Sequence, residues 1–182
     1  IKSYVRHSSS IVLTTPIFNV RKDRVSNPNT GYTGDFFVLE NPNWANVIAL
    51  DTQGRLIMVR QWRHGTETVE VEFPAGLVDP GEEPEMTALR ELREETGYTT
   101  DRVTLLGATK PNVAYQSNTC YTFLAEGCHR VAEPTFDRGE HAETFLIDPA
   151  EVGEWVQAGK IRSAISLSAL FWWMNHRQRL TW

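Results

Sequence analysis

The chain has 182 residues, a length that suits one domain with a small addition. Hydrophobic residues make up 41% and charged residues 23%, which excludes a disordered or fibrous protein. The net charge of −5 excludes a general attraction for nucleic acid or anionic lipid, so neither partner is expected. No apolar run approaches the roughly 18 residues of a membrane span, and the polar N-terminus lacks the apolar core of a signal peptide.

The predicted strands and helices follow one another in an α+β order. The segments expected to form strands are Ser10–Leu13, Ile17–Arg21, Asp35–Leu39, Ala45–Leu50, Arg55–Arg60, Thr68–Phe73, Val103–Ala108, Thr119–Ala125 and Glu143–Ile147. The segments expected to form helices are Pro84–Thr96, Pro149–Ala158 and Ser163–Arg177. The first strands are separated by turn-forming residues, which favours a small antiparallel sheet at the start of the chain.

Two cysteines flank the strand-like run at residues 121–125. An extended strand holds its ends too far apart for a disulfide between Cys120 and Cys128. We therefore expect two buried free thiols in a cytoplasmic protein.

The clearest helix carries a row of acidic residues. Pro84 suits its first turn and Gly97 suits its end. At about 100° per residue, Glu91, Glu94 and Glu95 fall within one arc of the helix. Such a face is commonly a solvated surface, and the alternative is a site for a hard divalent cation, which prefers carboxylate oxygens.

The spacing around this helix decides between the two readings. The segment from Gly76 to Tyr98 resembles the Nudix box, G-x5-E-x7-R-E-U-x-E-E-x-G-U, in which U is a bulky apolar residue. The matching residues are Gly76, Glu82, Arg90, Glu91, Leu92, Glu94, Glu95 and Gly97, and Tyr98 departs from the usual aliphatic residue. A random window would match with a probability of about 10⁻⁹. The chain thus resembles Nudix hydrolases, which share an α/β/α sandwich around a mixed sheet and cleave nucleoside diphosphates linked to another group.

The resemblance implies a metal site on the acidic face. Glu91 and Glu95 would be the principal ligands of Mg²⁺, with Mn²⁺ as a possible substitute. Glu94 would be a further ligand, direct or through water, and the Ala75 carbonyl could add another oxygen. A bound cation of this kind polarises phosphorus and lowers the pKa of bound water, which a carboxylate such as Glu94 or Glu95 can help to orient.

Other positions of the box are implied to be structural. Arg90 would pair with a box carboxylate, for which we favour Glu82, and hold the preceding loop on the helix. Gly76 and Gly97 would serve the backbone geometry.

Similarity outside the box points to a subgroup. Gln61-Trp62-Arg63 and the segment from Glu72 to Gly76 resemble motifs of ADP-ribose pyrophosphatases and related nucleotide-sugar hydrolases. By this resemblance Arg63 would bind the substrate diphosphate, although a plain surface arginine is the alternative. Glu72 would contact the terminal sugar or orient Arg63. Residues 1–43 would form an antiparallel β appendage exchanged within a homodimer, ahead of a Nudix domain at 44–182.

Two loops are implied to complete the site. The loop at residues 137–143 corresponds to the one that supplies a catalytic carboxylate, for which we choose Glu140 over Glu143, since Glu143 begins a strand. Pro111 and Tyr115 would lie on the sugar side of the pocket, although Tyr115 could equally pack a turn. Pro111 follows the box more closely than is usual in this subgroup, which leaves the substrate open.

The resulting prediction is a Mg²⁺-dependent hydrolase acting on ADP-ribose or another nucleoside diphosphate sugar. Its products would be a nucleoside monophosphate and a sugar phosphate. One alternative is another substrate: a dinucleoside polyphosphate, coenzyme A, or the 5′ end of RNA, the last disfavoured by the acidic charge. The other is a non-catalytic sensor of nucleotide sugars, which the intact box carboxylates disfavour.

Overall fold

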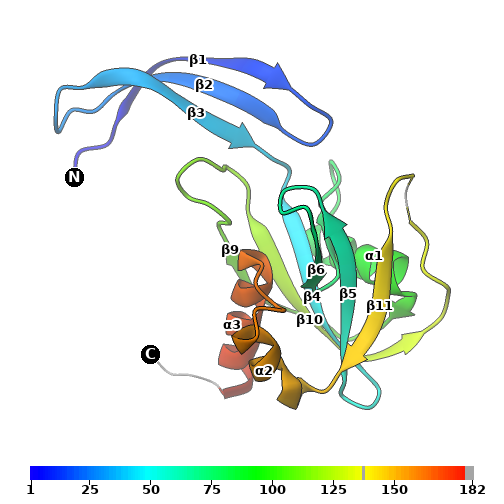
Figure 1. The fold of residues 1–182 in the computed structure, drawn as a ribbon. Helices are drawn as coiled ribbons and strands as arrows, with labels where there is room; N and C mark the ends of the chain where they lie inside the picture. Colours follow the sequence, from blue (N-terminus) through cyan, green and yellow to red (C-terminus); the bar gives the residue numbers. More distant parts are fainter. Residues whose placement is uncertain (137, 179–182) are drawn as a thin grey trace. The chain divides into compact units, whose positions relative to one another are not determined.

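A computed structural model describes residues 1–136 and 138–178. The chain divides into two compact units (Figure 1). The first contains Ile1–Asn43 together with Lys110–Thr119, and the second contains Trp44–Thr109 and the chain from Cys120 onward.

The first unit is an antiparallel sheet in the order β1-β2-β3. Its strands are β1 (Val5–Thr14), β2 (Asn19–Ser26) and β3 (Thr33–Glu40). Every residue of β1 is exposed, so neither side of this strand packs against a hydrophobic core. The Lys110–Thr119 loop joins β3 through the Leu39 amide, which donates a hydrogen bond to the Tyr115 carbonyl at 2.7 Å.

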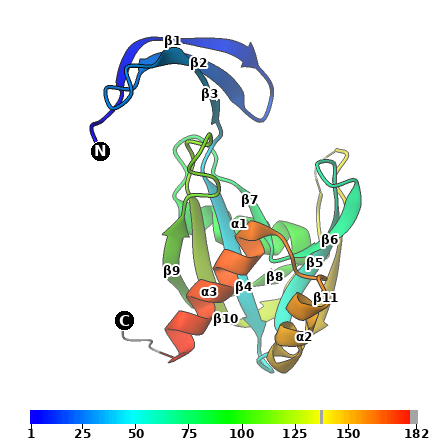
Figure 2. The ribbon, with the colours of Figure 1, turned by 60° about the vertical axis from the view of Figure 1, so that its left-hand side comes forward.

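The second unit is built on a mixed sheet in the order β11-β5-β4-β10-β8, to which β6, β7 and β9 are added at β5, β4 and β10 (Figures 1 and 2). Its strands are β4 (Trp44–Asp51), β5 (Leu56–Arg63), β6 (Thr68–Glu72), β7 (Ala75–Leu77), β8 (Tyr98–Thr99), β9 (Val103–Thr109), β10 (Cys120–Arg130) and β11 (Ala142–Ile147). β4 and β10 run parallel, whereas the other pairs are antiparallel.

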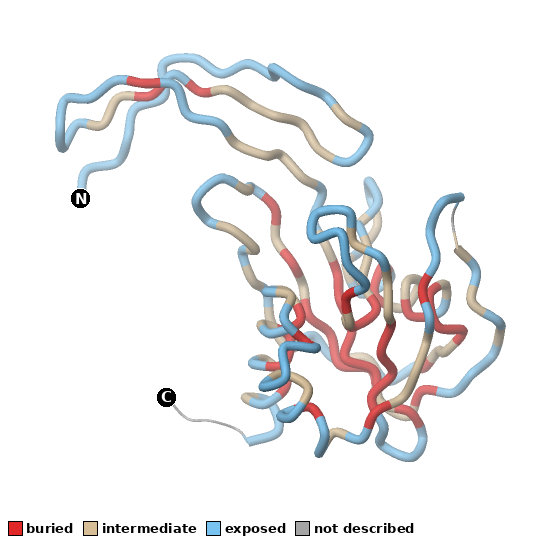
Figure 3. The backbone as a smooth tube through the Cα atoms, viewed as in Figure 1, coloured by how far each residue is buried: buried red, intermediate tan, exposed pale blue. Residues whose placement is uncertain are grey.

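Helices cover both faces of this sheet (Figure 2). They are α1 (Pro84–Thr96), the 3₁₀ turn η1 (Pro149–Glu151), α2 (Val152–Gln157) and α3 (Ala164–Gln178). Ala88 and Leu92 of α1 pack with Val47 on one face. Leu170 of α3 packs with Ile48 on the other, since successive residues of β4 point to opposite sides. The buried residues therefore concentrate along the sheet, between the helices (Figure 3).

The structure confirms the predicted fold class and the free thiols. Cys120 and Cys128 are both free and buried in β10, and burial raises the pKa of each thiol to about 12. The predicted helix at Pro149–Ala158 begins as a 3₁₀ turn capped by Asp148 before it becomes α2. Among the described residues, no helix is long and apolar enough to cross a membrane.

Candidate functional site

The acidic face of α1 is less exposed than its charge suggests. The helix ends where Gly97 adopts a left-handed conformation (φ 76°) and its amide donates to the Arg93 carbonyl at 2.8 Å. Leu92 is fully buried, and Glu95 lies three positions further on, at the border of the same packed row. Glu95 is consequently only 8% exposed.

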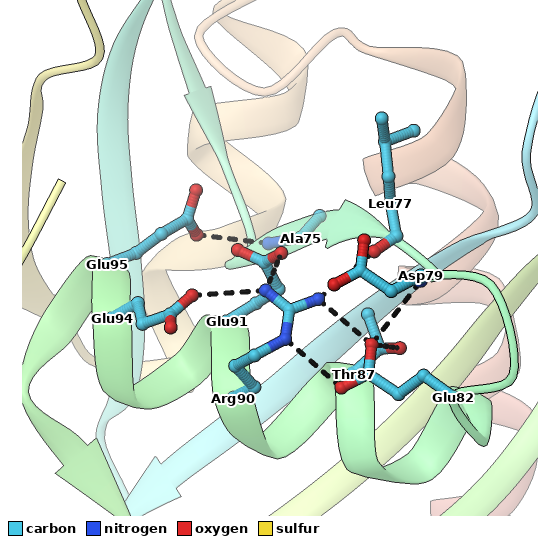
Figure 4. Close-up of polar contacts among 9 residues, drawn as sticks. All are labelled: Ala75, Leu77, Asp79, Glu82, Thr87, Arg90, Glu91, Glu94 and Glu95. Carbon is cyan, nitrogen blue, oxygen red and sulfur yellow. Dashed lines mark hydrogen bonds and ion pairs between the residues drawn. The ribbon is translucent and has the colours of Figure 1, made fainter. Parts of the chain in front are cut away.

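Arg90 lies at the centre of a network of carboxylates (Figure 4). Its Nε and one terminal nitrogen donate to the two oxygens of Glu82, at 3.1 and 3.0 Å. The other terminal nitrogen donates to Glu91 at 2.7 Å and to Glu94 at 3.1 Å. Arg90 also donates to the Leu77 carbonyl at 3.1 Å, which ties the loop before α1 to the helix.

Glu82 is held in its ionised form by the hydrogen bonds of Arg90, Thr87 and the Asp79 amide, the last at 3.4 Å. Besides Arg90, the Thr87 hydroxyl donates to Glu82 at 2.7 Å. These bonds, that of Arg90 first, lower the pKa of Glu82 to about 2. Sequence reasoning missed Thr87, although a threonine in the first turns of a helix, five positions after an acid, is a signal that could have found it.

The pKa values of Glu91 and Glu95 are raised, in contrast to that of Glu82. Burial raises the pKa of Glu95 to about 8, and the charge of Glu91 adds to this effect. Burial also raises the pKa of Glu91. The Ala75 amide donates to Glu95 at 3.1 Å, and a Cβ added at Gly76 would lie 1.9 Å from a Glu91 carboxylate oxygen. Gly76 therefore leaves the space that Glu91 occupies.

This donor set fits a hard divalent cation in its chemistry. Glu91, Glu94 and Glu95 offer carboxylate oxygens from one rigid helix. Burial raises the pKa of Glu91 and Glu95, so a nearby cation would favour their ionised forms. Among the described residues, no three acidic, histidine or cysteine side chains already stand in metal-binding geometry. Arg90 instead bonds Glu91 and Glu94 in this structure.

A cavity of about 460 Å³ lies in the same unit as this cluster. Arg63 and Glu140 both line it, together with Trp62. The Arg63 Nε donates to Glu72 at 2.7 Å, which orients the guanidinium. The charges of Arg63 and Glu140 shift the pKa of Glu95 in opposite directions, so both lie within electrostatic reach of the helix carboxylates.

Glu143 is placed differently from Glu140. It lies 4.0 Å from Arg60, and its side chain is 68% exposed. Arg60 in turn stacks on Phe145, whose ring packs against Trp155 near the core between the sheet and α2. Glu143 lines the same cavity as Glu140. The charge of Glu140 adds to the effect of burial on the pKa of Glu91 and Glu95, and the choice between the two carboxylates stays a prediction.

Pro111 and Tyr115 belong to the loop that pairs with β3 in the first unit. The Tyr115 side chain is 47% exposed, and its carbonyl accepts from the Leu39 amide. Their expected position beside the sugar stays a prediction.

Comparison with known proteins places the chain in a family. Residues 41–167 match the family model described as the NUDIX domain. An ADP-ribose pyrophosphatase of Bacillus subtilis is 34% identical over 134 residues, which cover 73% of this chain and 72% of that protein. An ADP-ribose pyrophosphatase of Mycobacterium tuberculosis is 32% identical over 165 residues, 90% of this chain and 79% of that protein.

A solved structure of an ADP compounds hydrolase shares the fold, with a TM-score of 0.85 at 22% identity, over 99% of this chain and 98% of that one. The Nudix box on α1, the sandwich around the mixed sheet and the match of the family model agree. The chain belongs to the Nudix hydrolase family.

Proposed function

We propose that this Nudix hydrolase cleaves the diphosphate of ADP-ribose or another nucleoside diphosphate sugar. The observation that carries the proposal is the row of carboxylates on α1, with Arg63 and Glu140 lining a cavity and lying within electrostatic reach of Glu95. This arrangement supports a site in which carboxylate oxygens bind a divalent cation and a guanidinium binds a phosphate. The names of the two ADP-ribose pyrophosphatases that cover most of the chain support the same substrate class.

In this proposal Glu91 and Glu95 are the principal ligands of Mg²⁺ or Mn²⁺. Glu94 and the Ala75 carbonyl contribute further oxygens. When bound, the cation neutralises diphosphate oxygens and lowers the pKa of a bound water. Arg90 remains anchored on Glu82 and keeps the loop before α1 in place.

The remaining steps fall to side chains of the cavity. Arg63, oriented by Glu72, binds a diphosphate oxygen through its free terminal nitrogens. Glu140 accepts the proton of the attacking water, and the effect of its charge on Glu91 and Glu95 supports this choice. The water oxygen bonds to one phosphorus of the diphosphate as the bond from that phosphorus to the bridging oxygen breaks. The bridging oxygen leaves with the other phosphate, and a nucleoside monophosphate and a sugar phosphate are released.

The proposal extends to the assembly. The chain acts as a homodimer in which residues 1–43 are exchanged, and Pro111 and Tyr115 contact the sugar. The exposure of Ile11, Leu13 and Phe37 on the first unit supports a partner for its sheet. Light-scattering mass tests this point, and a mass of about 20.7 kDa would contradict it.

A panel of nucleoside diphosphate sugars, assayed for monophosphate release with Mg²⁺ and with EDTA, tests the function. Glu95→Gln and Arg63→Ala should each lower kcat/KM by about 100-fold or more. Arg102→Ala, which removes another arginine–glutamate pair (Arg102 to Glu126, 3.4 Å), is the control and should leave activity unchanged. The enzymatic proposal fails if no diphosphate is turned over, or if Glu95→Gln behaves like the wild type.

A further inference from the structure

The C-terminal end of α1 is held by the segment that carries Glu140. The last four carbonyls of an α-helix have no partner within the helix and need donors from elsewhere. The Glu94 carbonyl accepts from the Thr135 amide at 2.7 Å. The Glu95 carbonyl accepts from the Thr144 hydroxyl at 3.1 Å. The two carbonyls belong to residues whose side chains form the acidic face.

The two donors stand on either side of Glu140 in the chain. Any residue other than proline supplies the amide at position 135, whereas the bond at 144 depends on a side-chain donor, here a hydroxyl. Thr144 lies within β11, opposite Val59 of β5, so its backbone is fixed by the sheet. Its hydroxyl therefore links a rigid strand to the carbonyl of Glu95, 49 residues earlier in the sequence.

We propose that Thr144 is a positioning residue, whose bond to the Glu95 carbonyl sets the segment carrying Glu140 against the acidic face of α1. The inference rests on the proposed function in one respect, namely that Glu140 accepts a proton from the attacking water. A base must stand within hydrogen-bond reach of that water, so a shift of about 1 Å in its segment lowers the rate.

Two substitutions separate the hydroxyl from the rest of the side chain. Thr144→Val keeps the branched shape but leaves the Glu95 carbonyl without its donor. Thr144→Ser keeps the donor and loses only a methyl group. Thr100→Val is the matched control, because the Thr100 hydroxyl also donates to a distant carbonyl, that of Glu126 at 2.7 Å, in the same unit.

The first readout is steady-state kinetics on the nucleotide sugar that the wild type turns over. Thr144→Val should lower kcat by about 10-fold with KM within about twofold, because binding groups such as Arg63 are untouched. Thr144→Ser should restore kcat to within about twofold of the wild type. Thr100→Val should lower the urea midpoint of unfolding as Thr144→Val does, yet leave kcat unchanged.

The second readout needs neither metal nor substrate. Amide hydrogen exchange of the metal-free protein should be faster over residues 138–143 in Thr144→Val and unchanged there in Thr100→Val and Thr144→Ser. If Thr144→Val does not fold, Thr144→Ala serves the same comparison with a smaller side chain.

The outcomes distinguish this inference from the function on which it rests. Wild-type kcat in Thr144→Val, a serine variant as slow as the valine variant, or unchanged exchange over 138–143 would each overturn the positioning role. A wild type that turns over no diphosphate would overturn the proposed function and the catalytic half of this inference. Hydrogen exchange would then still decide whether Thr144 holds the segment.

Discussion

Replacing Arg90 by glutamine should make the stability of this protein depend strongly on Mg²⁺. Arg90 is the cation that the structure places among Glu82, Glu91 and Glu94. Its removal leaves three neighbouring carboxylates without a counter-charge. In the proposed function, a bound divalent cation neutralises Glu91 and Glu94 but leaves Glu82 unpaired.

The size of the loss follows from the exposure of the pairs. The side chains of Arg90 and Glu82 are 30% and 19% exposed, so their two-pronged contact is mostly but not fully buried. Breaking a buried pair costs about 3–5 kcal/mol, whereas an exposed pair is worth at most about 1 kcal/mol. The Glu94 side chain is 45% exposed, so its pair with Arg90 contributes no more to stability than an exposed pair does. We expect Arg90→Gln to lose about 3 kcal/mol of unfolding free energy in EDTA.

Mg²⁺ should return more stability to the variant than to the wild type. A ligand at 100 times its Kd stabilises the folded state by about 2.7 kcal/mol. In the wild type, the Arg90 guanidinium competes for oxygens of Glu91 and Glu94, which reduces the gain from the metal. We expect the Mg²⁺-induced gain to be larger by about 1 kcal/mol in Arg90→Gln.

Urea unfolding of both proteins, in EDTA and in saturating Mg²⁺, measures this difference directly. Arg162→Gln is the control, because it removes the arginine that pairs with buried Glu70 at 2.6 Å, outside the box. The unfolding free energy that Arg162→Gln loses should be the same with and without Mg²⁺. A Mg²⁺-induced gain in Arg90→Gln that equals or falls below the wild-type gain would refute the reasoning, since Arg90 would then build the metal site rather than share its ligands.

Three further predictions concern other positions. Glu140→Gln should lower kcat by about 100-fold or more in the diphosphate assay, whereas Glu143→Gln should keep it within a few-fold, and the reverse ranking would reassign the base. Gly76→Ala should weaken Mn²⁺ binding measured by electron paramagnetic resonance, because the new methyl would displace the carboxylate 1.9 Å away, and unchanged affinity would contradict this. Hydrogen bonds from Arg162 and Thr68 lower the pKa of Glu70 from 4.5 to about 2. The stabilisation by its ionised carboxylate is therefore complete above about pH 4.5 and is lost as the pH falls through about 2. Glu70→Gln should accordingly unfold at a lower urea concentration than the wild type at pH 7, and the difference between the two urea midpoints should disappear by about pH 2. A difference that stays constant with pH would show that the charge of Glu70 is not responsible for the stabilisation.

The helix of the box could be predicted from the sequence because its signals are local. Pro84 and Gly97 mark its ends, and the structure places α1 at Pro84–Thr96 as predicted. The strands β7 and β8 were missed, since Ala75–Leu77 and Tyr98–Thr99 are short segments without alternation. Their extended shape comes from pairing with β4 and β10, which no local pattern reveals.

The residue types of the candidate site could be predicted from the sequence, but the burial and the hydrogen-bond partners of those residues could not. Helical spacing placed Glu91, Glu94 and Glu95 on one face, yet it could not show that Glu95 is 8% exposed. That burial depends on the sheet beneath α1. The Thr144 hydroxyl is likewise invisible in the sequence, because its partner lies 49 residues away and the bond exists only once β11 pairs with β5.

On α1, the packing of the apolar side chains conflicts with the ionisation of the neighbouring carboxylates. Leu92 must be buried to hold α1 on the sheet, and Glu95, three positions later, is drawn into the same environment. An ionised carboxylate there is costly, as its raised pKa shows, and the charge of Glu91 increases that cost. Arg90 offsets part of it by bonding Glu91 and Glu94, whereas Glu95 accepts a hydrogen bond from the neutral Ala75 amide. In the proposed function, a divalent cation would relieve the repulsion that remains, so the helix that stabilises the fold would also hold the metal.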